Sequence, residues 1–280
     1  MLGLLALAGC TVNDPVQELV RQRRAADPFR EAGFSQTPFV LSPAGIHQLL
    51  DLLAGSNPVS RELWPFCYAG AWVAPRERPR AGAVVIEIST LTEYRLGNVV
   101  LNANIAGEEF AARIAALPGM DGKAVRAWKN ALGKCKDDLR GEAANAILAC
   151  YPTATDAQRI ERQVIAGLRT APAPPQSIER CLRDAADAFA GAPVGLSLHH
   201  FQYMSGGRAV DWPPHLNPQI RAAAARLDLP LFDGAGLVAR HGNEKALAPD
   251  CRAWSDEFLP VVADALDEFV RSFCGAADAA

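Results

Sequence analysis

Cys10 is the first residue whose position in the sequence suggests chemistry. It follows an apolar run at residues 4–8 and Gly9, and it precedes Asn13 and Asp14, either of which can begin a helix as its N-cap. A cysteine between a buried strand and a helix N-terminus lies beside free backbone N–H groups, which stabilise a thiolate. Cys10 is therefore a candidate nucleophile for an ester or thioester carbonyl group.

Two other interpretations of Cys10 stay open. A small buried cysteine after a strand is common in protein cores. Residues 7–10, LAGC, also have the form of a bacterial lipobox, in which the cysteine is lipidated after cleavage before it. Because no Lys or Arg precedes Arg21, the positively charged start of a signal peptide is missing. We expect a cytoplasmic protein, with a lipoprotein anchored through Cys10 as the alternative.

A cysteine nucleophile needs a general base, and His199 and His200 are the candidates. They follow another apolar run, residues 194–198. Side chains of adjacent residues in an extended strand point to opposite faces, so at most one of the two can serve Cys10. A hydrogen-bonded structural histidine is the alternative. The spacing is not that of a metal site, and we predict no metal and no bound cofactor.

Polar side chains at the other strand ends are candidates for orienting the base or binding the substrate. Glu87 lies within an apolar run at residues 83–88, where a carboxylate must be paired or protonated. We expect Glu87 to pair with an arginine, with orientation of a histidine by Glu87 or Asp233 as the alternative. The residues predicted to bind the substrate are Ser89, Asp14 and Asp233.

Four short apolar runs predict the strands that position these residues. The runs do not alternate with polar residues, which is typical of parallel strands covered by helices on both faces. The carboxyl ends of such strands form the ligand-binding edge of the sheet, so the candidate residues should converge there. We predict a three-layer α/β/α fold with a mainly parallel sheet of about five strands, including residues 4–8, 83–88, 194–198 and 229–232.

Apolar residues with helical spacing occur through much of the sequence between the four apolar runs. A last helix is predicted from the apolar stripe between Trp254 and Phe273, with Pro260 tolerated in its first turns. We predict a single domain over residues 1–274, with a helical insertion at about 107–176 that ends in a stiff proline-rich connector, and a disordered tail at 275–280. The other predicted helices are residues 46–53, 110–116, 125–132, 157–168 and 178–189.

The composition excludes several classes of protein. The 280 residues carry 28 Lys and Arg against 31 Asp and Glu, with no long basic run, which is unlike a nucleic-acid-binding protein. The richest apolar stretch, residues 1–9, has about half of the ~20 residues that cross a bilayer, so no transmembrane segment is predicted. The 7 cysteines include no CxxC pair, which argues against a zinc ribbon and a secreted disulfide framework.

The order of these features resembles the SGNH/GDSL hydrolase superfamily. The resemblance rests on AGCTVND at residues 8–14, on IEIS at residues 86–89, on a late strand that ends in histidine, and on Asp250 ahead of the last helix. The opening is similar to that of the cysteine-bearing branch, which includes acyltransferases assigned to polysaccharide biosynthesis. The parts of the chain that share the resemblance are residues 1–17, 83–104 and 194–270.

This resemblance implies a flavodoxin-like SGNH fold and an esterase or acyltransferase. The substrate would be a small molecule or a glycan, with acyl-CoA as one conceivable co-substrate. The superfamily places its general-base histidine three residues after the last aspartate, but here Asp250 is followed by Ala253. Ala8 also stands where a glycine is expected, and no G-x-N-D oxyanion block is present.

These departures leave two outcomes open for a member of the superfamily. In the first, the base has moved to His199 or His200, and Asp250 either orients it or caps the last helix. In the second, the protein has lost the reaction and keeps the fold as a binding protein. Ala253 is the feature that favours the second outcome.

Overall fold

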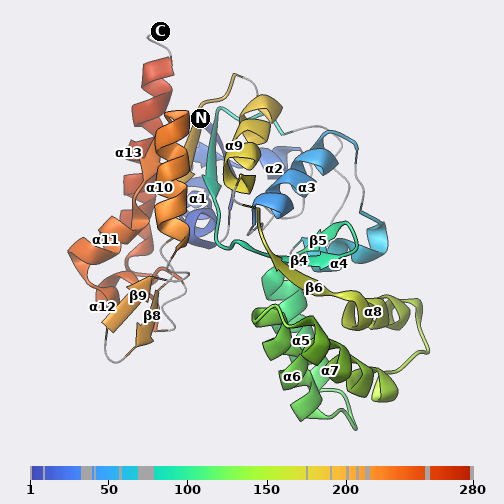
Figure 1. Ribbon diagram of the computed structural model, residues 1–280. Coiled ribbons are helices and arrows are strands. Elements are labelled where there is room, and N and C mark those ends of the chain that lie inside the picture. The colour runs from blue at the N-terminus through green and yellow to red at the C-terminus, as the bar shows by residue number, and fades with distance from the viewer. Residues whose placement is uncertain are drawn as a thin grey trace.

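The structure is a computed structural model, shown in Figure 1. It describes residues 2–8, 10–32, 40, 42–56, 59–68, 79–174, 176–189, 191–199, 202–205, 208–211, 215–249 and 253–277. At least one helix lies between each two successive strands of its central sheet, as in an α/β protein.

A parallel sheet of 5 strands forms the centre of the protein. Its order is β10-β7-β3-β1-β2, so the first strand is internal and β3 lies beside it. The sequence pattern does not predict β2, because its two alanines are too short for an apolar run. The bounds are β1 (Leu2–Leu7), β2 (Ala25–Ala26), β3 (Ala83–Glu87), β7 (Val194–Ser197) and β10 (Leu231–Phe232).

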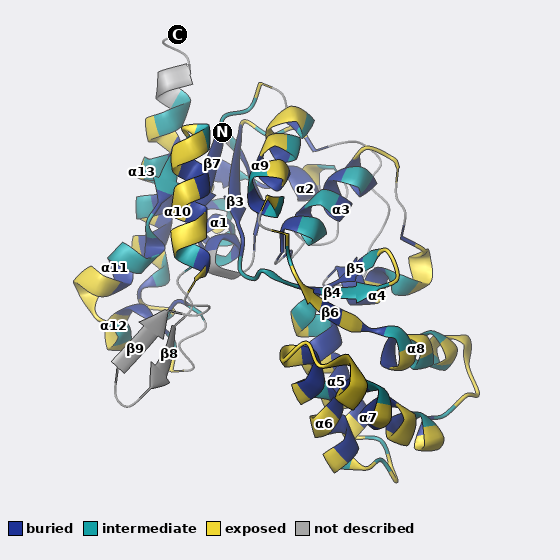
Figure 2. Ribbon diagram, in the orientation of Figure 1, coloured by how far each residue is buried: buried dark blue, intermediate teal, exposed yellow. Residues whose placement is uncertain are grey.

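Helices cover both faces of this sheet and give the three predicted layers. In β1, Leu4 and Ala6 belong to one apolar cluster and Leu5 and Leu7 to the other, and all four side chains are buried. Figure 2 shows the sheet as the buried centre of the protein, between helices with exposed outer sides. The first cluster includes residues of α1 (Cys10–Arg21), α11 (Gly234–His241), α12 (Asn243–Ala246) and α13 (Leu259–Ala277). The second includes residues of α2 (Pro28–Glu31), α3 (Pro43–Leu53), α9 (Ser177–Ala188) and α10 (Leu216–Leu227).

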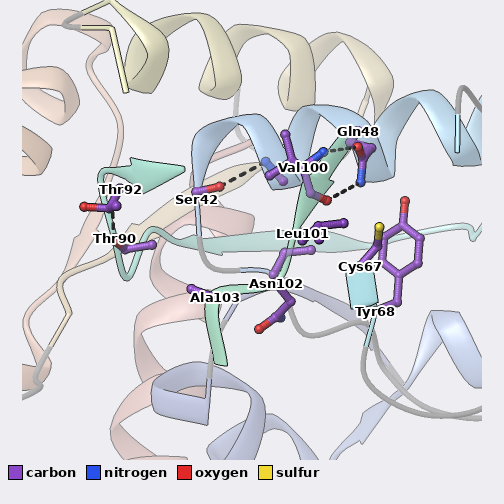
Figure 3. Close-up of a pocket in the computed structure, with 12 residues that line it drawn as sticks. Ser42, Gln48, Cys67, Tyr68, Thr90, Thr92, Val100, Leu101, Asn102 and Ala103 are labelled. Carbon is purple, nitrogen blue, oxygen red and sulfur yellow. Dashed lines mark hydrogen bonds between the residues drawn. The ribbon is translucent and has the colours of Figure 1, made fainter. Parts of the chain in front are cut away.

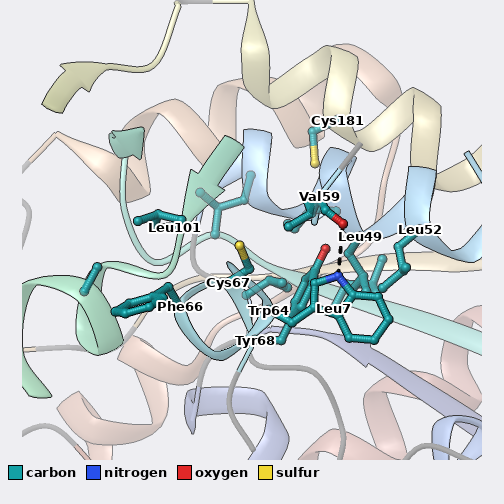
Figure 4. Packing of buried hydrophobic residues seen from close by; sticks show 14 of the residues in the cluster. Leu7, Leu49, Leu52, Val59, Trp64, Phe66, Cys67, Tyr68, Leu101 and Cys181 are labelled. Atoms are coloured by element: carbon teal, nitrogen blue, oxygen red, sulfur yellow. Dashed lines mark hydrogen bonds between the residues drawn. The ribbon is translucent and has the colours of Figure 1, made fainter. Parts of the chain in front are cut away.

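A short helical segment lies beside α3 and consists of η1 (Arg61–Leu63) and α4 (Trp64–Cys67). No residue of η1 is buried, and Figure 4 shows Trp64, Phe66 and Cys67 of α4 among the side chains of the central core. The Trp64 indole N–H donates a hydrogen bond to the Val59 carbonyl oxygen at 3.2 Å, which satisfies its polar group within the core. Cys67 is buried in this segment.

The chain between β3 and β7 adds a smaller sheet and a group of helices. β4 (Thr92–Leu96) pairs antiparallel with β5 (Val99–Leu101) and β6 (Arg169–Pro172). The helices between β5 and β6 are grouped below this sheet in Figure 1, and the predicted proline-rich connector is in part strand β6. Their bounds are η2 (Asn104–Glu109), α5 (Phe110–Ala115), α6 (Gly122–Gly133), α7 (Asp137–Cys150) and α8 (Asp156–Gly167). A separate hairpin consists of β8 (Gln202–Ser205) and β9 (Arg208–Asp211).

The last helix differs from its prediction at both ends. It begins at Leu259, although the apolar stripe starts at Trp254, which is buried before the helix and forms an isolated β-bridge. Pro260 is the second helical residue, where its missing N–H group costs nothing. The helix continues to Ala277, into the stretch expected to be a disordered tail, and residues 278–280 lie outside the described part.

Candidate functional site

Four neighbouring strands end at the same edge of the central sheet. Their register sets one residue from each strand in a single row, which consists of Leu7, Ile86, Leu196 and Leu231. Cys10, Ser89, His199 and Asp233 each follow this row within three positions, and Glu87 comes directly after Ile86. The sheet therefore brings the predicted site residues of four separate segments to one edge, as expected for a parallel α/β sheet.

Cys10 is the first residue of α1 and follows the internal strand β1 almost directly. The predicted junction of strand and helix N-terminus is confirmed for the backbone. The prediction that Asn13 or Asp14 is the N-cap is wrong, because the helix has already begun at Cys10. The Cys10 side chain lies outside the described part of the structure.

Glu87 and His199 form the central contact of the site. The Glu87 side chain is fully buried, and its Oε1 lies 2.7 Å from Nδ1 of His199. A carboxylate can only accept a hydrogen bond, so Nδ1 is the protonated ring nitrogen and Nε2 is the one that can take up a proton. No arginine among the described residues pairs with Glu87, and the alternative, orientation of a histidine, describes the contact that is present there.

Ser89 supports the same carboxylate. Its hydroxyl donates a hydrogen bond to Oε1 of Glu87 at 3.0 Å. The second oxygen, Oε2, is buried and has no hydrogen-bond partner among the described residues. The Ser89 hydroxyl therefore has a structural role in the site. Its predicted contact with a substrate stays a prediction.

Asp14 adds a second carboxyl group next to this pair. It lies one helical turn after Cys10, on the same face of α1, and it is half-buried. Its pKa is raised from 3.8 to about 6, first by burial and then by the negative charge of Glu87. Asp14 therefore changes its charge near neutral pH, within the electrostatic reach of the Glu87–His199 pair.

Two asparagines hold the backbone on either side of the site, and the sequence analysis did not assign them this role. Asn13 is buried, and its Nδ2 donates a hydrogen bond to the Ala8 carbonyl oxygen at 3.0 Å, across the turn that carries Cys10. Asn217 of α10 bonds to both the N–H and the carbonyl group of His199. An asparagine near a helix start is the only sequence signal, and it is too common to assign a partner from sequence.

The comparison with known proteins gives the family. A family model described as the TviD N-terminal domain matches residues 2–269. The chain belongs to this family. No curated protein and no solved structure matches it. The matched range contains the central sheet, the helices on both of its faces up to residue 269 of α13, and every residue of the Glu87–His199 site.

Of three further predicted site residues, the structure of this TviD N-terminal domain describes one, Asp233. Asp233 caps α11, since its Oδ1 accepts a hydrogen bond from Gly236 N–H at 2.9 Å, and its Oδ2 accepts one from Arg221 at 3.1 Å. Its contact with a substrate stays a prediction. His200 and Asp250 lie outside the described residues. Capping of the last helix by Asp250 is wrong, because α13 begins at Leu259, well after that position.

The cavity shown in Figure 3 is too small to be an alternative functional site. It lies between α3, α4 and β5, and its volume of about 10 Å³ is room for about one water molecule. Cys67 lines it, but burial raises the pKa of its thiol to about 12, so the reactive thiolate does not form near neutral pH. Burial also raises the pKa of Cys181, which lies in the core.

The described part of the chain holds no group of three or more His, Cys, Asp and Glu side chains that could bind a metal ion. In the same residues no helix is long and apolar enough to cross a membrane. Two other histidines have local partners away from the strand ends. His47 of α3 lies 3.0 Å from Asp184 of α9, and His241 packs against the ring of Phe258.

Proposed function

We propose that the protein is an acyl-transfer enzyme of the SGNH type, either an esterase or an acyltransferase, with Cys10 as its nucleophile. His199 is the general base and Glu87 orients it. The observation that carries the proposal is the 2.7 Å contact between Glu87 and His199, at the strand edge where α1 begins with Cys10. A buried carboxylate on one nitrogen of a histidine is the arrangement that prepares the other nitrogen for proton transfer.

In the proposed reaction, Nε2 of His199 takes the thiol proton of Cys10, and the sulfur attacks the carbonyl carbon of the ester or thioester. Backbone N–H groups at the start of α1 stabilise the oxyanion that forms. The His199 imidazolium, stabilised by Glu87, then protonates the departing alkoxide or thiolate. Water or an acceptor hydroxyl group attacks the acyl-cysteine, gives up its proton to His199, and releases the acid or the new ester.

A polysaccharide or one of its precursors is the proposed substrate. The TviD family is related to polysaccharide biosynthesis, and the resemblance to the cysteine-bearing SGNH branch points to the same area. We propose acyl-CoA as the donor in the acyltransferase version, and the cytoplasm as the location. Ser89 and Asp233, after the ends of β3 and β10, and Asp14, in the second turn of α1, are proposed to contact the substrate.

The test measures hydrolysis of aryl esters and acyl thioesters by the purified chain. We expect Cys10→Ala and His199→Ala each to lower kcat/KM at least about 100-fold, and Glu87→Gln to lower it to a similar extent because the base loses its orienting charge. Cys150→Ala, which removes an exposed cysteine, is the matched control and should keep full activity. A kcat/KM that is unchanged in both Cys10→Ala and His199→Ala contradicts the proposal.

A non-catalytic binding protein is the second candidate function, and Ala253 is the observation that favours it. Ala253→His separates the two candidates. If the base has moved to His199, an added histidine should leave turnover unchanged or lower it. If the protein is an inactive relative whose other groups survive, the added histidine should raise turnover above the level of the unmodified chain.

A further inference from the structure

Asn217 binds both backbone polar groups of His199. Its Oδ1 accepts a hydrogen bond from the His199 N–H group at 3.1 Å, and its Nδ2 donates one to the His199 carbonyl oxygen at 2.8 Å. A side-chain amide that satisfies the donor and the acceptor of one residue does what a neighbouring strand would do. We refer to these two bonds as the Asn217 clamp.

The Asn217 clamp lies where the sheet ends. β7 ends at Ser197, and the N–H group of Leu198 still bonds to the Phe232 carbonyl oxygen at 3.0 Å. Phe232 is the last residue of β10, so the neighbouring strand stops before it reaches His199. The backbone polar groups of His199 need partners outside the sheet, and Asn217 supplies both.

The first turn of α10 fixes the clamp to the protein core. Asn217 is the second residue of this helix, and it lies beside Leu216 and one turn before Ile220, each only 1% exposed. A side chain on a packed helix loses little further freedom when it forms hydrogen bonds, so it can hold its partner in one place.

We propose that Asn217 is a positioning residue that directs the His199 ring towards Glu87. The two ends of His199 are held by different elements: Glu87 of β3 binds the ring, and Asn217 of α10 binds the backbone. With the backbone fixed, rotation about two side-chain bonds is the only freedom left to the ring, and the Glu87 contact removes it. The effect on catalysis rests on the proposed function, whereas the effect on the ring does not.

The chain contains a matched control for this inference. Oε1 of Gln48 accepts a hydrogen bond from the Val100 N–H group at 2.8 Å, and Nε2 donates one to the Val100 carbonyl oxygen at 2.9 Å, as Figure 3 shows. This second clamp has the same chemistry and joins α3 to β5 instead of holding a strand end of the site. Its loss should lower stability in a similar way without changing the His199 ring.

The experiment compares Asn217→Ala, Asn217→Asp and Gln48→Ala with the unmodified chain. Asn217→Asp keeps an acceptor for the His199 N–H group, and its negative charge favours a helix N-terminus, so this variant tests the inference even if the alanine variant does not fold. Three kinds of measurement are made: hydrogen exchange of the His199 amide, the 15N signals of the His199 ring, and the steady-state kinetics (kcat and KM) of turnover that depends on Cys10.

In Asn217→Ala we expect about tenfold faster exchange of the His199 amide, because one hydrogen bond is lost there. We also expect ring signals that show a mixture of tautomers, and a kcat that falls about 10- to 100-fold at nearly unchanged KM. Asn217→Asp should keep the amide protected and still disturb the ring signals and kcat. Gln48→Ala should leave the ring signals and kcat unchanged.

Ring signals and kcat like those of the unmodified chain in both Asn217 variants would overturn the inference. An equal disturbance of the His199 ring in Gln48→Ala would also overturn it, since the effect would then follow stability and not the clamp. If no turnover depends on Cys10, the proposed function fails, and amide exchange and ring tautomer alone decide whether Asn217 positions His199.

Discussion

Glu87 is a carboxylate enclosed by the sheet, and the groups that face it determine what it can do. A buried charge needs compensation, and here the Nδ1–H of His199 and the Ser89 hydroxyl provide it on one oxygen. The sequence indicates that Glu87 is unusual, because it interrupts an apolar run. It does not reveal the partner, because His199 lies 112 positions away and meets Glu87 only through the pairing of β3 with β7.

The thiol of Cys10 should be the most reactive in the chain. Cys135 and Cys150 are exposed, so they serve as internal references for an ordinary accessible thiol. A cysteine at a helix N-terminus beside a general base holds more thiolate near pH 7, and we expect Cys10 to react with iodoacetamide at least about tenfold faster than either reference. Peptide mapping by mass spectrometry after brief exposure measures the three rates.

His199→Ala is the control for this prediction of reactivity. If the base raises the thiolate fraction, Cys10 should lose most of its advantage in this variant while Cys135 and Cys150 keep their rates. Cys67 and Cys181 are buried and should stay unmodified in the folded protein. A Cys10 that reacts no faster than Cys135 in the unmodified chain contradicts the prediction.

Asp14 should make the stability of the protein depend on pH. Its pKa is about 6 in the folded chain against an ordinary value of 3.8, so the folded state binds the proton more tightly than the unfolded state does. The folded state therefore loses stability as the pH rises from about 4 to about 6, and the loss stays constant above that range. Asp14→Asn removes the ionisation and should raise stability at pH 7.5 by about 1–2 kcal/mol, once the partial exposure of Asp14 is taken into account.

Urea unfolding between pH 4 and pH 7.5 measures this effect. The stability difference between Asp14→Asn and the unmodified chain should be small at pH 4 and should grow up to about pH 6. Asp187→Asn, which changes an exposed aspartate of α9, is the matched control and should show no such growth. A difference that does not change with pH contradicts the assignment of a raised pKa to Asp14.

At the scale of elements, the sequence predicts the strands that are buried on both faces and misses those that are not. β3 and β7 are apolar except for Glu87 and Ser197 at their carboxyl ends, because helices cover both of their sides. β4 has the sequence TEYRL, and its buried Glu93 is compensated by Arg95 at 2.6 Å, so no apolar pattern marks it. The last helix is predicted to begin too early because Trp254 shares the helical spacing of the stripe, although tertiary packing, and not a helix, buries it.

The contact between β7 and α13 depends on a glycine in the strand. A Cβ atom at Gly195 would lie 2.9 Å from the ring of Phe269 and 2.9 Å from that of Phe273, closer than such atoms approach in proteins. Gly195→Ala should therefore force α13 away from the sheet and lower the free energy of unfolding by about 1–3 kcal/mol. Chemical denaturation of the purified variant measures the change.

Gly141→Ala is the control, because it makes the same substitution where there is room. Apart from the backbone of its own helix and its chain neighbours, no atom lies within 4 Å of a Cβ at Gly141 in α7, so alanine should stabilise the protein by about 0.5–1 kcal/mol there. Equal effects of the two substitutions would show that β7 and α13 do not pack as tightly as the structure indicates.

At the scale of the whole molecule, the central sheet and the helical stretch share one core. A single cluster of buried side chains includes Leu5 and Leu7 of β1 together with Phe110 of α5 and Trp128 of α6. We propose on this basis that residues 1–274 are one domain, with the helices between β5 and β6 as an insertion. The sequence predicts the helices of this stretch from their spacing, but the shared core depends on contacts between distant segments.

The place of β1 in this core bears on the lipobox at residues 7–10. Cleavage before Cys10 would remove β1, which pairs with both β2 and β3 and contributes Leu4, Leu5 and Leu7, each at most 2% exposed, to the core. Loss of a buried leucine side chain costs about 2–5 kcal/mol, so the loss of three approaches the whole stability of a typical protein, about 5–15 kcal/mol. We expect a chain that starts at Cys10 not to fold, as measured by near-UV circular dichroism and thermal unfolding.

A lipobox would have two consequences, removal of β1 and attachment of lipid to Cys10. Cys10→Ser in the full-length chain separates them. It prevents lipid attachment but keeps β1, so it should unfold cooperatively at nearly the same temperature as the unmodified chain. The chain that starts at Cys10 should instead show no cooperative transition, because β3 would lose its neighbour in the middle of the sheet. A native spectrum and a cooperative transition in the shortened chain would show that the sheet forms without β1, and lipid attachment at Cys10 would then be compatible with the fold.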